Sequence, residues 1–119
     1  MMESDQFTLQ EANDLVPWLE ETFQRLTGLR DEIAGLRSRA GGEAVDPDQG
    51  ELEALERGLD DGFQEILDRG IIVRNIASGL VDFPSQREGR EVYLCWIGGE
   101  ERIDFWHETD QGFAHRQPL

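Results

Sequence analysis

The residues with chemically useful side chains gather in the last third of the chain. His107 is followed within eight residues by Glu108, Asp110 and His115. An imidazole beside carboxylates can transfer protons or bind a metal ion. Neighbouring residues of a strand point to opposite faces, so His107 and Glu108 cannot converge without a bend. The other interpretation of His107 is a half-buried histidine that hydrogen-bonds a backbone carbonyl or Asp82.

Asp82 interrupts an otherwise apolar segment, residues 80–83, in which an unpaired carboxylate would be costly to bury. It therefore needs a partner, and the candidates are Arg90, Arg116 and His107. An aspartate paired in this way could be a structural clamp or half of a catalytic dyad. The sequence leaves both roles open.

The candidate site residues form two groups. An acid/base or metal-dependent enzyme of the hydrolase type would use Asp82, Glu91 and His107 as catalytic residues. No cofactor is predicted and no metal ligand is assigned, although a divalent metal ion could bind His107 and Asp82. A binding module would hold its ligand with guanidinium and aromatic groups. The candidates for ligand binding are Arg90, Trp96, Trp106 and Arg116.

Composition argues against several classes of partner. The 119 residues include 26 acidic and 11 basic ones, all arginine, and the net charge is −15. Nucleic acids and anionic membranes bind basic surfaces, so we expect neither as a partner. An acidic composition without lysine is typical of a halophilic protein; the alternative is a GC-rich genome that favours arginine codons together with an ordinary acidic surface.

The single cysteine, Cys95, cannot form an intramolecular disulfide and fits a reducing compartment. It lies in an expected strand and is interpreted as a packing residue. We expect a cytoplasmic protein without a membrane anchor, because the longest apolar run is only six residues, 92–97.

Two helices are expected before residue 70. Thr8 and Glu11 form a capping box, and apolar residues then recur at three- and four-residue spacing to about residue 40. Pro17 predicts a bend near residues 13–17.

A polar loop over residues 41–50 precedes a second helix that ends at Gly70. The two helices would form a long antiparallel hairpin. Because its first helix would overhang, we expect a homodimer.

From residue 71 the pattern is that of short strands, at about 71–76, 80–83, 91–97 and 101–107. Gly98 and Gly99 predict a hairpin between the last two strands, with a loop of two or four residues. That register fixes which side chains share a face. The predicted core face carries Val92, Leu94, Trp96, Ile103, Phe105 and His107, and the opposite face carries Glu91, Tyr93, Cys95, Arg102, Asp104 and Trp106.

Several segments together resemble an uncharacterised bacterial family, catalogued as domain of unknown function 2203. The resemblance extends over almost the whole chain and is weakest in residues 41–50. His115 departs from the family pattern, which has a small residue there. The resemblance implies no activity, and it implies signature positions at Asp82, Arg90, Glu91, Trp96, His107 and Arg116. The segments that carry it are residues 7–13 with Pro17, 79–84, 89–96, 106–107, and 112–114 with Arg116 and Pro118.

The sequence therefore predicts a single α+β domain over residues 1–119. A long antiparallel helical hairpin, residues 1–70, is followed by a small antiparallel β-sheet of three to four strands and a tail, residues 71–119. The favoured function is an interaction, assembly or small-ligand-binding module. The alternative is the small enzyme described above.

Overall fold

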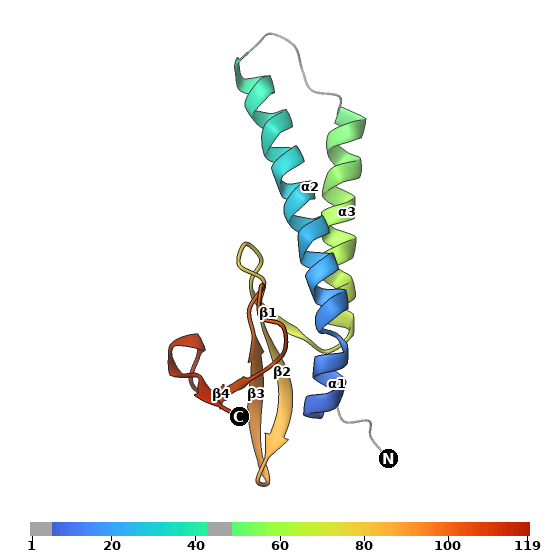
Figure 1. Ribbon diagram of the computed structural model, residues 1–119. Coiled ribbons are helices and arrows are strands. Elements are labelled where there is room, and N and C mark those ends of the chain that lie inside the picture. Colours follow the sequence, from blue (N-terminus) through green and yellow to red (C-terminus); the bar gives the residue numbers. More distant parts are fainter. Residues whose placement is uncertain (1–5, 43–48) are drawn as a thin grey trace.

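The computed structural model describes residues 6–42 and 49–119 and has an α+β fold (Figure 1). Its helices are α1 (Leu9–Asp14), α2 (Val16–Gly42) and α3 (Gln49–Asp68). A five-stranded antiparallel sheet of order β1-β2-β3-β4-β5 follows, so the α+β class is confirmed and the predicted three or four strands are too few. The strands are β1 (Ile72–Asn75), β2 (Leu80–Arg87), β3 (Arg90–Trp96), β4 (Phe105–Glu108) and β5 (Gln117–Pro118). A short 3-10 helix, η1 (Phe113–His115), separates β4 from β5.

The first helix begins and bends as predicted. The Thr8 hydroxyl accepts a hydrogen bond from the Glu11 amide at 3.0 Å, and the Glu11 carboxylate accepts one from the Thr8 amide at 2.8 Å. These two bonds satisfy amides that have no partner within the helix. α1 ends before Leu15, and α2 restarts with Pro17 in its first turn, where proline costs no helical hydrogen bond.

α2 and α3 lie side by side and run in opposite directions, and both extend well past the sheet (Figure 1). Near the sheet they approach closely: a Cβ placed on Gly62 would lie 2.5 Å from Cδ2 of Leu26. Beyond the sheet a second apolar cluster joins the two helices, formed by Ile33, Leu36 and Leu52. The predicted loop over residues 41–50 lies mostly outside the described residues. Among the described residues, no helix combines the length and apolarity needed to cross a membrane.

The helices cover one face of the sheet, and the segment after β4 lies over the other (Figure 1). The helix-covered face carries the main core. Its strand residues are Val81, Phe83, Val92, Leu94, Trp96 and Trp106, which pack on Ala12, Leu19, Phe23 and Leu26 of the helices.

The predicted register between β3 and β4 is wrong, by one residue for the four-residue loop and by three for the two-residue loop. Tyr93 pairs with His107, and Leu94 pairs with Trp106. Because side chains alternate between faces, this shift exchanges the two sides of β4. Trp106 therefore lies in the helix-packed core, whereas His107 faces the other side of the sheet together with Cys95.

Gly98 and Gly99 form a turn in which the Glu100 amide donates to the Ile97 carbonyl at 3.1 Å, but strand pairing does not resume directly after it, and the β3–β4 connection spans residues 97–104. The tight hairpin joins β2 to β3 instead, where Glu88 and Gly89 have φ of 54° and 80°. Positive φ at both central residues matches the right-handed twist of the flanking strands.

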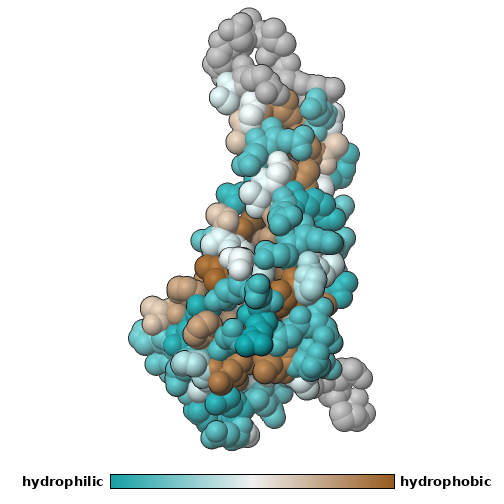
Figure 2. Space-filling view, in the orientation of Figure 1, coloured by the Kyte–Doolittle hydropathy of each residue, from teal (hydrophilic) through white to brown (hydrophobic). Residues whose placement is uncertain are grey.

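Hydrophilic residues cover most of the face shown in Figure 2. Among the described residues, only four large apolar side chains are exposed: Leu9, Leu67, Phe113 and Leu119. The homodimer expected from the sequence concerns a second chain and stays a prediction.

Candidate functional site

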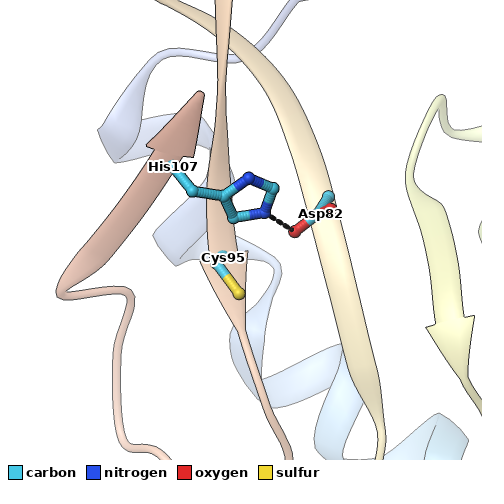
Figure 3. A group of neighbouring side chains, drawn as sticks. All are labelled: Asp82, Cys95 and His107. Atoms are coloured by element: carbon cyan, nitrogen blue, oxygen red, sulfur yellow. Dashed lines mark hydrogen bonds and ion pairs between the residues drawn. The ribbon is translucent and has the colours of Figure 1, made fainter. Parts of the chain in front are cut away.

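Asp82, Cys95 and His107 meet on the sheet face that the helices leave uncovered (Figure 3). They come from three adjacent strands: Asp82 pairs with Cys95 across β2 and β3, and His107 lies on β4 beyond them. All three are buried, with relative exposures of 2%, 0% and 1%. Their ligand atoms lie within 4.8 Å of one another.

The Asp82 carboxylate is held on both oxygens. Its Oδ1 lies 3.0 Å from Nε2 of His107, and its Oδ2 accepts a 2.9 Å hydrogen bond from Nε of Arg74. The bond to Asp82 raises the pKa of Arg74 above its ordinary value. Asp82 is thus a buried carboxylate with a guanidinium on one side and an imidazole on the other, which offsets the cost of burying it.

His107 has an acceptor at each ring nitrogen. Nδ1 lies 2.8 Å from the carbonyl oxygen of Glu108, so that nitrogen carries a proton and donates it. Nε2 faces the Asp82 carboxylate, and one further proton is held between those two groups. The ring also contacts Tyr93 edge-on, with centroids 5.6 Å apart. These contacts fix the imidazole in one orientation.

Cys95 lies in this cluster rather than in a purely apolar environment. Burial raises the pKa of its thiol to about 12, and the nearby Asp82 carboxylate adds to the rise. A thiol with this pKa is protonated at neutral pH and is a poor nucleophile.

A pocket of about 460 Å³ opens over the cluster, and we call it the sheet pocket. Asp82 and Cys95 lie at its base, and Phe113 contributes an apolar side chain that is 44% exposed. The remaining lining residues are Arg74, Leu80, Thr109, Asp110, Gln111 and Gly112.

The structure brings together only some of the residues selected from the sequence. Asp82 and His107 converge, as the sequence suggested, whereas Glu91 is exposed near the start of β3 and lies outside the cluster. Arg90 pairs with Glu108 at 2.9 Å, away from Asp82. His115 is exposed in η1.

The other selected residues have structural contacts. Trp96 is fully buried and donates its indole N–H to the carbonyl of Glu100, and Trp106 is also in the core. Arg116 pairs with the Glu100 carboxylate at 3.1 Å and lies over the rings of Phe105 and Phe113.

Sequence reasoning missed Arg74 as the partner of Asp82. The sequence around Arg74 gives little indication of this pairing, because Arg74 lies in an expected strand and exposed polar residues are common in strands. Only the pairing of β1 with β2, in which Ile72 lies opposite Asp82, brings that strand beside the aspartate.

The fold and site define a class: an α+β domain with a buried Asp–His pair beneath a pocket on its antiparallel sheet. The chain belongs to the family described as uncharacterized conserved protein (DUF2203), whose model matches residues 6–119. The family resemblance stated from the sequence is thereby confirmed, whereas the bacterial origin stays a prediction. Neither a curated protein nor a solved structure matches the chain.

Proposed function

We propose that the protein is a small-ligand-binding module whose ligand occupies the sheet pocket and carries a carboxylate or phosphate group. The observation that carries this proposal is the position of Arg74. Its Nε is anchored on Asp82, its side chain is 44% exposed, and it lines the pocket. Its planar guanidinium, which also lies over the Tyr93 ring, has the arrangement of donors that suits carboxylates and phosphates.

An anionic ligand would have to bind through local contacts, because the chain as a whole is acidic. The net charge of −15 repels anions in general. Arg74 and His107 nevertheless both contact Asp82, and Arg116 lies beside Phe113 at the edge of the pocket. Arg74 is the basic residue of the lining, whose acids are Asp82 and Asp110, so the proposal depends on Arg74, and the Phe113 ring offers an apolar contact for the ligand's organic part.

Titration calorimetry with inorganic phosphate and with malonate tests the proposal. Arg74→Gln should weaken the binding of either probe by about 10-fold or more, a loss of about 1.4 kcal/mol. The matched control is Arg102→Gln, because Arg102 is an exposed arginine paired with Asp104 on another part of the surface. Equal binding by the wild type and Arg74→Gln, or no binding of either probe by the wild type, would contradict the proposal.

A second candidate function is acid/base catalysis in the same pocket. The 3.0 Å contact between Asp82 and His107 favours it, because a carboxylate paired with an imidazole can exchange a proton with it, and Asp82 is the member of the pair that lines the pocket. Glu91 takes no part, since it lies outside the cluster. Turnover of 4-nitrophenyl phosphate or 4-nitrophenyl acetate that is lost in Asp82→Asn and kept in Glu91→Gln would support this candidate. Turnover that is equal in both variants would exclude it.

A further inference from the structure

We propose that Asp82, Cys95 and His107 form a site for one divalent transition-metal ion, with Zn²⁺ the best fit. The ion would lie at the base of the sheet pocket, beside the proposed ligand. Metal binding itself does not depend on the proposed function; only the role of the bound ion in ligand binding rests on it. The carboxylate oxygen, thiol sulfur and imidazole nitrogen already lie within 4.8 Å of one another. They are fixed by three adjacent strands rather than by loops.

The contacts around the two charged ligands match those of metal sites. A histidine that ligates a metal through one nitrogen usually donates the other N–H to a carbonyl or carboxylate. His107 does so with Nδ1, which is 2.8 Å from the Glu108 carbonyl, so Nε2 is the nitrogen presented to the cluster. Arg74 likewise holds Oδ2 of Asp82 at 2.9 Å and leaves Oδ1 to bind the ion.

The donor set selects the class of metal. Thiolate and imidazole ligands favour zinc and neighbouring transition metals, whereas magnesium and calcium prefer oxygen ligands. Ligand bonds of about 2.0 to 2.3 Å in a tetrahedron separate the ligand atoms by about 3.3 to 3.6 Å. The 3.0 Å between Oδ1 of Asp82 and Nε2 of His107 is close to that value, and Sγ of Cys95, within 4.8 Å of both atoms, would move closer to them when the ion binds.

Three protein ligands leave one coordination position. Asp82 and Cys95 line the sheet pocket, so the fourth position would open toward it. An open position of this kind binds water or a ligand in zinc enzymes, whereas structural zinc sites are closed by a fourth protein ligand. A carboxylate or phosphate bound near Arg74 could therefore also ligate the ion.

Binding conserves the charge of the cluster. Zn²⁺ would replace two protons: the one on the Cys95 thiol and the one shared between Nε2 of His107 and Asp82. Two positive charges enter and two leave, so the net charge of the buried group is unchanged. Both protons pass to the buffer.

Cobalt provides the test, because a thiolate bound to Co²⁺ gives a charge-transfer band in the near ultraviolet and Cys95 is the only cysteine. Untagged full-length protein, stripped of metal, is titrated with Co²⁺. We expect a band that saturates at one equivalent and disappears when Zn²⁺ displaces the cobalt. Cys95→Ala should remove the band, and His107→Gln should weaken Co²⁺ binding by at least about 10-fold.

His115→Gln is the matched control, because His115 is the only other histidine and is exposed outside the cluster. Circular dichroism confirms that each variant is folded, and Cys95→Ala leaves the contacts of Asp82 with Arg74 and His107 in place. Cobalt binding without a thiolate band, or Co²⁺ binding by His107→Gln as tight as that of the wild type, would overturn the proposed ligands.

The anion titrations are repeated on the metal-free protein to separate the two proposals. Anion binding that depends on Arg74, without a cobalt band, would overturn the metal site alone. A cobalt band without anion binding would overturn the anion-binding function alone.

Discussion

Asp82 and His107 lie on strands that are not neighbours, yet Oδ1 of Asp82 is 3.0 Å from Nε2 of His107. β3 lies between their strands, and the contact passes over Cys95 of that strand (Figure 3). A side-chain contact that crosses a strand ties three strands together on the face without helices. The same contact supplies the charged base of the sheet pocket.

Asp82→Asn should lower the free energy of unfolding by about 3 kcal/mol, because removal of one partner leaves buried charges unpaired. Urea denaturation measures the change. Asp104→Asn is the matched control: its carboxylate is 53% exposed and pairs with exposed Arg102, so its loss should cost less than about 1 kcal/mol. Equal losses in the two variants would show that the Asp82 contacts contribute little.

A double-mutant cycle isolates the contact between Asp82 and His107. The variants Asp82→Asn, His107→Gln and their combination should give a coupling energy of about 2 kcal/mol. The same cycle on Arg90 and Glu108, an ion pair whose arginine side chain is 58% exposed, should give less than about 1 kcal/mol. A coupling energy near zero for the first pair would contradict the 3.0 Å geometry.

Cys95 should make the protein less stable in alkali. Burial raises the pKa of its thiol from 9.0 to about 12 in the folded protein. Below pH 9 both folded and unfolded chains keep the thiol proton, and the contribution of Cys95 to stability is constant. Between pH 9 and 12 only the folded chain keeps it, so stability falls by about 1.4 kcal/mol per pH unit from this group.

The pH effect is measured as a difference between wild type and Cys95→Ala, because other groups titrate equally in both. Urea unfolding at pH 8, 9 and 10.5 should show a constant difference up to pH 9 and a decline above it. A difference that stays constant to pH 10.5 would mean that the thiol titrates at its ordinary pKa.

Two helical glycines should respond oppositely to alanine. Gly28→Ala should raise the free energy of unfolding by about 0.5 to 1 kcal/mol, because nothing lies within 4 Å of the added Cβ and alanine favours the helix. Gly62→Ala should lower it by about 1 kcal/mol or more, because its Cβ would lie 2.5 Å from a methyl group of buried Leu26. Thermal denaturation distinguishes the two. Stabilisation by both would show that the α2–α3 contact can widen at little cost.

The helical part of the fold could be predicted because its signals are local. The Thr8 and Glu11 side chains that cap α1, and the proline that restarts the helix as α2, act within one or two turns of the chain. The sheet depends on the connection between β3 and β4, which distant contacts stabilise. The amide of Ile103, for example, donates to the side chain of Asn13 at 2.7 Å, and no pattern near Gly98 reveals that bond.

The candidate site could be predicted only in part. A carboxylate in an apolar strand needs a partner, which led to His107 as one candidate for Asp82. The sequence could not select Arg74, and the error in register, an odd number of residues for either predicted loop, placed His107 and Cys95 on opposite faces. The structure puts them on one face, which is what assembles the cluster.

The most direct test of the site follows His107 itself by nuclear magnetic resonance, with ¹⁵N-labelled protein titrated with inorganic phosphate. We predict saturable shifts of the His107 ring nitrogens and of Nε of Arg74, while the ring nitrogens of exposed His115 stay unchanged and act as an internal control. Shifts confined to His115 or to residues of α2 and α3, with His107 and Arg74 unmoved at saturation, would contradict a ligand site in the sheet pocket.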